Sequence, residues 1–127
     1  MADVAILVLR IVMGIVMVLH GVFKFQNKRL FDQKWREDYG FPQGSVLLSG
    51  ILQVAGGVAI AAGVFVRLAA LILFLVMLVA TYVSIVKHRE PFLSTPEGKG
   101  WDLNFLLMGA LLALTFLGDG QWALAGW

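Results

Sequence analysis

Five polar residues of this sequence stand inside long apolar runs or at their edges. Arg10 and His20 interrupt the first run, Gln53 interrupts the second, and Lys24 and Asp102 stand where runs end or begin. Hydrocarbon solvates charged and hydrogen-bonding groups poorly, so such side chains usually face a protein interior and bind ligands or transfer protons. We therefore take Arg10, His20, Lys24, Gln53 and Asp102 as a candidate site for a polar ligand such as a quinone headgroup.

His20 and Lys24 are four residues apart and share one face of a helix. Placed near Asp102, they could donate hydrogen bonds to a quinone carbonyl or relay a proton during its reduction. The alternative is structural, with polar residues pairing to hold helix ends together. The residue types fit both interpretations equally, so no catalytic role is assigned.

Arg10 lies about six residues into the first run, roughly 9 Å from its edge. Its side chain could reach back to the membrane surface, or it could face the protein interior and bind an anion, a quinone oxygen or Asp119. Arg10 and His20 are ten residues apart, roughly 15 Å along a helix. We therefore expect two polar sites at different depths.

The residue types give little support to a haem or metal site. Neutral imidazole is the usual haem ligand, but His20 and His88 stand at different depths, and we expect His88 to be solvated in its charged Lys-His-Arg-Glu segment. Two histidines and an aspartate without regular spacing do not indicate a metal site. The absence of cysteine excludes disulfides, thiolate metal sites and iron–sulfur clusters.

The composition indicates that lipid is the solvent of this protein. The chain has 127 residues, of which 60% are hydrophobic and 14% charged, and its mean hydropathy is +0.86. A soluble domain of this size could not bury so much apolar surface. The net charge of +2 comes from basic residues gathered in loops, as expected near anionic lipid, and does not indicate nucleic-acid binding.

Four apolar runs are long enough for membrane helices, at residues 4–23, 45–66, 68–86 and 101–117. Crossing the hydrocarbon core takes about 20 residues, and Gly63 with Arg67 breaks the second run from the third. We therefore predict an all-α membrane protein, an up-down bundle of four transmembrane helices that forms a single domain over residues 1–127. In the first loop, Phe31, Trp35 and Tyr39 recur every four residues, which predicts a short interfacial helix.

The loop charges predict the orientation of this bundle. Lysine and arginine concentrate in the first and third loops, so the positive-inside rule places both loops in the cytoplasm and both termini outside. This topology leaves Arg10 near the other face and gathers six polar residues in one leaflet: His20, Lys24, Gln53, His88, Asp102 and Asn104.

Small residues recur at helical spacing inside the runs. Gly14 and Gly21 share a face of the first run, Gly57 precedes Ala61 by four residues, and Gly109 precedes Ala113 by four. In lipid, such residues allow helices to approach closely, so we expect these faces to pack against other helices.

The sequence resembles the DoxX family of four-helix membrane proteins over nearly its whole length. The resemblance is carried by Leu9-Arg10-Ile11 to Gly14, Leu19-His20-Gly21 to Lys24, the stretch from Ser49 to Arg67, Gly100-Trp101-Asp102-Leu103, and Leu117-Gly118-Asp119-Gly120-Gln121-Trp122. Residues that match the family pattern are Arg10, His20, Gly21, Lys24, Gly56, Gly57, Arg67 and Asp102. Gln53 departs from it, because the family often has glutamate there, and so does Gln121, where the family often has a basic residue. Without a carboxylate, residue 53 can still form hydrogen bonds.

The resemblance implies a link to quinone-dependent oxidoreductases. We expect a small integral membrane subunit of a redox or respiratory-type complex that interacts with membrane quinone and does not act as an enzyme alone. One alternative is an accessory subunit that stabilises a larger membrane complex, and another is a small oligomeric transporter. The expected partners are membrane lipid and either other membrane subunits or further copies of this chain.

Overall fold

The computed structural model describes residues 2–27, 29, 33, 37, 45–118 and 120. They form the helices α1 (Ala2–Gln26), α3 (Ser45–Ala62), α4 (Val66–Tyr82) and α5 (Asp102–Leu117), and a short π-helix, η1 (Val83–Lys87), continues α4. No β-strand occurs among the described residues. The predicted all-α fold is confirmed, and the predicted interfacial helix around Phe31, Trp35 and Tyr39 lies outside the described residues.

The helix boundaries differ from the predicted runs by a few residues. α1 extends beyond 4–23 at both ends, and α3 ends at Ala62, four residues before the predicted end. Arg67 lies in the first turn of α4 and not in the connection. The break itself was predicted correctly, and its cause is the backbone at Gly63.

Gly63 ends α3 in a left-handed conformation, with φ at 81°. Its N–H donates to the carbonyl of Ile60 at 3.2 Å, and the N–H of Val64 donates to Ala59 at 2.8 Å. This pairing is the Schellman arrangement, which glycine permits because it lacks a Cβ. The chain then reverses within three residues, so α4 starts beside the end of α3.

Two of the helices are long and apolar enough to cross a membrane. They are Ala2–Gln26, with a hydropathy of 2.5, and Val66–Lys87, which joins α4 to η1 and has a hydropathy of 2.7. α3 and α5 are also apolar, but with 18 and 16 residues they extend only about 27 and 24 Å. A hydrocarbon core is about 30 Å thick, so crossing by all four helices remains a prediction.

α1 and α3 pack through two pairs of facing glycines. A Cβ added to Gly14 would lie 2.7 Å from the carbonyl oxygen of Gly57, and one added to Gly21 would lie 2.8 Å from that of Gly50. The two glycines of each helix are seven residues apart, or about two helical turns, so the same two helix faces are in contact at two positions along their length. The predicted packing of the Gly14 and Gly21 face is confirmed, and it brings the two backbones into direct contact.

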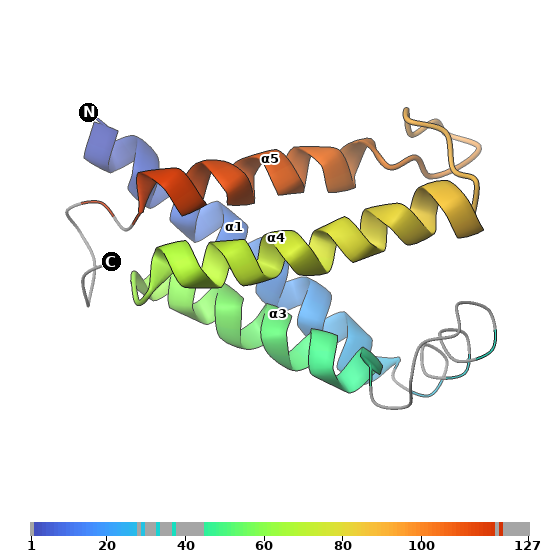
Figure 1. Ribbon diagram of the computed structural model, residues 1–127, viewed down its shortest axis with the longest axis horizontal. Coiled ribbons are helices and arrows are strands. Elements are labelled where there is room, and N and C mark those ends of the chain that lie inside the picture. The colour runs from blue at the N-terminus through green and yellow to red at the C-terminus, as the bar shows by residue number, and fades with distance from the viewer. Residues whose placement is uncertain are drawn as a thin grey trace.

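α4 and α5 form a second pair, and the two pairs share one apolar core. Its fully buried members include Met17, Ile60, Leu73 and Leu111, one from each helix. Figure 1 shows α3 and α4 close together at their short connection and diverging toward their opposite ends. The start of α1 and the end of α5 lie at the end with this short connection, which we call the turn end. The opposite end of the helices, from which the two longer connections leave, is called the loop end.

The outer faces of the helices carry large apolar side chains. Leu19, Leu106 and Phe116 are 62%, 67% and 72% exposed. Soluble monomers rarely expose so much contiguous apolar surface. These faces suit a hydrocarbon surrounding.

Candidate functional site

Arg10 is buried at the turn end, where it closes the C-terminus of α3. Its Nε donates to the carbonyl oxygen of Ile60 and its Nη2 to that of Ala61, both at 3.0 Å. These carbonyls belong to the last turn of α3, where the helix dipole leaves partial negative charge. Arg10 therefore faces the protein interior and does not extend to the membrane surface. Asp119, proposed as one of its partners, lies outside the described residues.

Arg67 closes α5 in the same way. Its Nη1 donates to the carbonyls of Thr115 at 3.2 Å and Phe116 at 2.8 Å, in the last turn of that helix. Gly118 follows with φ at 80°, and a Cβ there would lie 2.9 Å from the guanidinium. In each helix pair, the second helix thus ends with an arginine from the first helix and a glycine of positive φ.

Gln53 stands on the buried face of α3, about halfway between the glycine contacts at Gly50 and Gly57. Only 2% of the residue is exposed. Its Oε1 is fully enclosed, and no described residue donates a hydrogen bond to it. A buried acceptor without a donor is destabilising by about 1–3 kcal/mol, so Oε1 is a candidate hydrogen-bond partner for a ligand or for a buried water.

His20 and Lys24 lie at the loop end of α1, and each contacts a different group. The Nζ of Lys24 donates to the Oγ of Ser49 on α3 at 3.1 Å. The Nδ1 of His20 lies 2.8 Å from the carbonyl oxygen of Val16, one turn earlier in α1. Lys24 therefore helps to join α1 to α3, while the described hydrogen bond of His20 is local to its own helix.

Asp102 starts α5 and organises the loop that precedes it. Its carboxylate accepts hydrogen bonds from the Oγ of Ser94 at 2.7 Å and from the N–H of Ser94 at 3.1 Å. A carboxylate at a helix N-terminus also interacts favourably with the helix dipole. The hydrogen bonds of Asp102 that the structure describes fix the loop to the helix.

A group of buried polar residues lies on α4, η1 and α5. The sequence predicts Asn104 in the same leaflet as His20 and does not single out Thr81 or Ser84. Thr81 donates to the carbonyl of Met77 at 2.7 Å, and the Nδ2 of Asn104 lies 3.5 Å from the Oγ of Ser84. Ser84 belongs to η1, and π-helical turns of this kind often occur at functional sites. The position of Thr81, Ser84 and Asn104 on the buried faces of their helices could have been predicted from their spacing relative to the apolar residues of those helices.

Glu90 follows η1 and carries a second enclosed acceptor. Its Oε2 is buried and receives no hydrogen bond from a described residue, while its N–H donates to the carbonyl of Ser84 at 2.9 Å. His88, two residues earlier, is exposed, as its charged neighbours predicted. Across the described part of the chain, no three histidine, aspartate or glutamate side chains gather closely enough to hold a metal ion.

Comparison with known proteins identifies the family. The family model described as DoxX matches residues 5–86, which is more than half of the chain. The chain belongs to the DoxX family. Membership and the two long apolar helices together indicate a protein associated with the membrane.

A curated relative of this DoxX protein adds a link to redox chemistry. The chain is 29% identical, over 113 residues, to a protein of Bacillus subtilis (strain 168) named "Putative oxidoreductase CatD". The match covers 89% of this chain and 80% of that protein. No solved structure matches the chain significantly.

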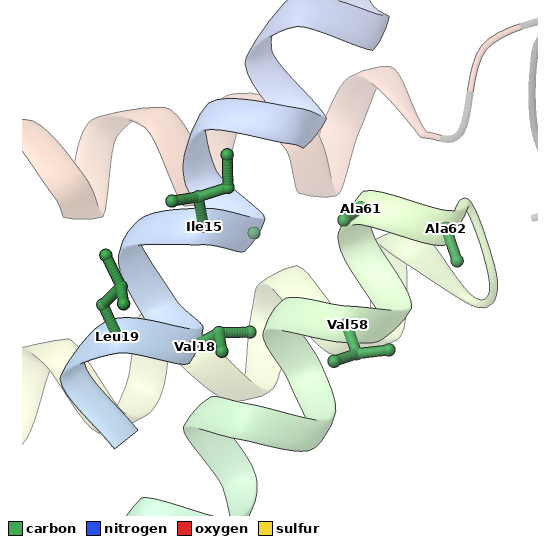
Figure 2. Close-up of a pocket in the computed structure, with 7 residues that line it drawn as sticks. Ile15, Val18, Leu19, Val58, Ala61 and Ala62 are labelled. Atoms are coloured by element: carbon green, nitrogen blue, oxygen red, sulfur yellow. The ribbon is translucent and has the colours of Figure 1, made fainter. Parts of the chain in front are cut away.

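An apolar groove of about 480 Å³ lies on the outer face of the α1–α3 pair in this DoxX protein. Figure 2 shows Ile15, Val18 and Leu19 of α1 on one side and Val58 of α3 on the other. Gly14 and Ala61 form part of the lining, at one of the places where the two helices are in close contact. Since its lining side chains are all apolar, the groove offers contact to a hydrocarbon chain and no hydrogen bond to a headgroup.

Proposed function

We propose that this DoxX protein is an integral membrane component of a redox system and binds the headgroup of a membrane quinone between its two helix pairs. The observation that carries the proposal is the buried amide of Gln53, whose Oε1 lacks a donor among the described residues. An enclosed hydrogen-bonding group in an otherwise apolar interior suits a ligand that is mostly apolar and carries few polar atoms. A quinone headgroup has this chemistry, because its carbonyl oxygens can accept from the Nε2 of Gln53 and the hydroxyl groups of its reduced form can donate to Oε1.

The composition of the protein interior supports this choice of ligand. Met17 and Met77 are buried on the facing helices, and methionine adapts its shape to flat aromatic groups. Toward the loop end the interior becomes polar, with Lys24, Ser84 and Asn104. The oxygens of a headgroup could then reach polar side chains while its ring contacts apolar ones.

Electron transfer is assigned to a partner. The chain has no cysteine and only two histidines, of which His88 is exposed on a loop. These side chains do not form a ligand set for haem or an iron–sulfur cluster. The name of the Bacillus subtilis relative supports a redox role, and we propose that a second protein exchanges electrons with the bound quinone.

Quinone binding is tested on the full-length protein in lipid nanodiscs prepared without quinone. Addition of a decyl-substituted benzoquinone should raise the Tm in a saturable manner, because a ligand of the folded state stabilises it. Decylbenzene at the same concentration is the control, since it carries the alkyl chain on a ring without oxygens. An equal response to both compounds, or no response to either, would contradict quinone binding.

We also propose that all four helices cross the membrane, with both long loops in the cytoplasm. The chain lacks cysteine, so single cysteines report topology without background. Glu97→Cys lies in the loop before α5 and Phe65→Cys in the α3–α4 connection, and both positions are exposed. A membrane-impermeant thiol reagent should label Phe65→Cys in intact cells and Glu97→Cys only after lysis. Labelling of both from outside would rule out a crossing by α4, and the reverse pattern would overturn the orientation.

A second candidate function is that of an accessory subunit in a larger membrane complex. A Cβ added to Gly109 of α5 would meet no atom within 4 Å, so this small-residue face is open in the isolated chain and was not packed as predicted. Another helix could approach it closely. Gly109→Leu should abolish co-purification of a partner protein, whereas Gly98→Leu, in a loop with equally open surroundings, should not. Identical co-purification by both variants would remove the candidate.

A further inference from the structure

We infer that the connection between η1 and α5, residues 91–101, lies in the headgroup layer of the membrane and completes the lipid-facing surface of α5. Its partner is therefore a phospholipid leaflet. The inference rests on the proposed crossing of the membrane by α5, and it adds which part of the chain contacts lipid at the loop end of that helix. It does not depend on quinone binding.

The length of α5 leaves part of the membrane uncovered. Its 16 residues extend about 24 Å, whereas the 22 residues of Val66–Lys87 extend about 33 Å. Arg67 in the first turn of α4 donates to the last turn of α5, so the two helices are level at the turn end. At the loop end α5 therefore begins short of the end of η1, as Figure 1 shows, and the connection 91–101 lies beside the remaining length. A hydrocarbon core of about 30 Å is longer than α5 alone.

An aromatic cluster joins this connection to α5. The ring centroid of Phe92 lies 4.6 Å from that of Trp101 and 5.8 Å from that of Phe105, and both pairs are edge-to-face. Phe105 is exposed on the outer face of α5, which it shares with Phe116 three turns later. The cluster thus extends this outer face beyond the first residue of the helix. Tryptophan is enriched at the headgroup level of membrane proteins.

The apolar side chains of the connection are open to their surroundings. Leu93 is 64% exposed, and Phe92 is exposed although it contacts two other rings. Such exposure is unfavourable in water and favourable where lipid is the solvent. Lys87 and Arg89, both exposed at the end of η1, add positive charge that suits anionic headgroups at the same level.

The backbone of the connection is hydrogen-bonded within the chain. The N–H of Trp101 donates to the carbonyl of Pro91 at 3.1 Å, and that of Asp102 donates to the carbonyl of Phe92 at 2.9 Å. The N–H of Ser94 donates to the carboxylate of Asp102 at 3.1 Å. Lipid offers backbone groups few partners, so a segment close to hydrocarbon has to supply them itself. These bonds meet that requirement where the exposed apolar side chains stand.

The tip of the connection is polar. The N–H groups of Thr95 and Gly98 donate to each other's carbonyls at 2.8 and 3.2 Å, and Glu97 between them is exposed. Hydrocarbon solvates a carboxylate poorly, so we expect the tip on the aqueous side of the headgroups. Within one connection, Leu93 should therefore contact lipid and Glu97 should contact water.

The experiment compares fluorescent probes on single cysteines of the full-length protein in nanodiscs. Leu93→Cys tests the connection, Glu97→Cys is the matched control in the same connection, and Leu112→Cys reports on α5; all three positions are exposed. The chain has no other cysteine. Quenching is measured with phospholipids that carry a nitroxide near the headgroup or near the end of the acyl chain, and separately with aqueous iodide.

The outcomes separate this inference from the proposed crossing. The ratio of lipid quenching to iodide quenching should be several-fold higher at Leu93→Cys than at Glu97→Cys, with the shallow nitroxide more effective than the deep one. Equal ratios at these two positions overturn the inference, while quenching of Leu112→Cys by the deep nitroxide leaves the crossing by α5 standing. Strong iodide quenching at Leu112→Cys overturns the crossing and the inference with it.

Discussion

The Nε of Arg10 and the carbonyl oxygen of Ile60 are joined by a hydrogen bond of 3.0 Å that is buried between α1 and α3. Arg10 is 2% exposed although it carries a charge in an apolar helix. The guanidinium donates to two carbonyl groups in the last turn of α3, those of Ile60 and Ala61, and the bond to Ile60 adds to the one that this carbonyl accepts from Gly63. A residue that suggests anion binding in the sequence therefore has a described role in closing a helix.

Replacement of Arg10 should destabilise the protein more than replacement of Arg67. Arg10→Ala leaves buried carbonyls and a cavity, and we expect a loss of roughly 2–4 kcal/mol in the free energy of unfolding. Arg67→Ala removes an equivalent pair of bonds, but Phe116 is exposed, and we expect a loss of about 1 kcal/mol. Denaturation of both variants in the same detergent, followed by circular dichroism, compares them. Equal losses would argue against the special role of burial at Arg10.

Alanine at Gly14 should disrupt the contact between α1 and α3. The added Cβ would lie 2.7 Å from both the Cβ of Ala61 and the carbonyl oxygen of Gly57, and the backbone cannot move aside cheaply. Such overpacking typically destabilises by about 1–3 kcal/mol.

Gly109→Ala is the matched control for this substitution. A Cβ there meets no atom within 4 Å, and alanine favours the helix by about 1 kcal/mol over glycine. The Tm should therefore fall for Gly14→Ala and stay level or rise for Gly109→Ala. If both variants melt alike, the glycine contact does not hold the two helices together.

Removing the amide of Gln53 should stabilise the protein when no ligand is present. Gln53→Leu replaces an enclosed polar group by an apolar one of similar volume, so the unsatisfied acceptor disappears. We expect the free energy of unfolding to rise by about 1–3 kcal/mol. Thermal unfolding of the quinone-free protein measures this. A marked decrease in Tm would show that the amide has a structural partner in the apo protein.

Loss of the contact between Asp102 and Ser94 should loosen the loop before α5. Asp102→Ala removes the acceptor of two hydrogen bonds that hold the exposed loop. We expect faster cleavage between residues 91 and 101 in limited proteolysis, with little change in global unfolding because the helices do not depend on the loop. Ser94→Ala keeps the carboxylate and the backbone bond and should give an intermediate rate. Cleavage unchanged in both variants would contradict the anchoring role.

Much of this architecture is local in origin and could be predicted from the sequence. Apolar runs with a helical period specify helices, and Gly63 ends one of them because its left-handed conformation suits glycine. Depth along a helix follows from residue number, so the spacing of the polar residues is enough to assign them to two levels. The π-helical turn at Val83–Lys87 left no such signal.

The partners of the polar side chains are decided only by the tertiary structure. The carbonyls that Arg10 binds are 50 and 51 residues away in the chain, and they are available because the facing glycines bring α1 and α3 into contact. The same packing encloses Gln53, buries Ser84 with Asn104 and directs Asp102 to its own loop. A sequence shows which groups need a hydrogen bond. Which of them receive one depends on how the helices approach each other, and at Gln53 the described fold leaves that need unmet.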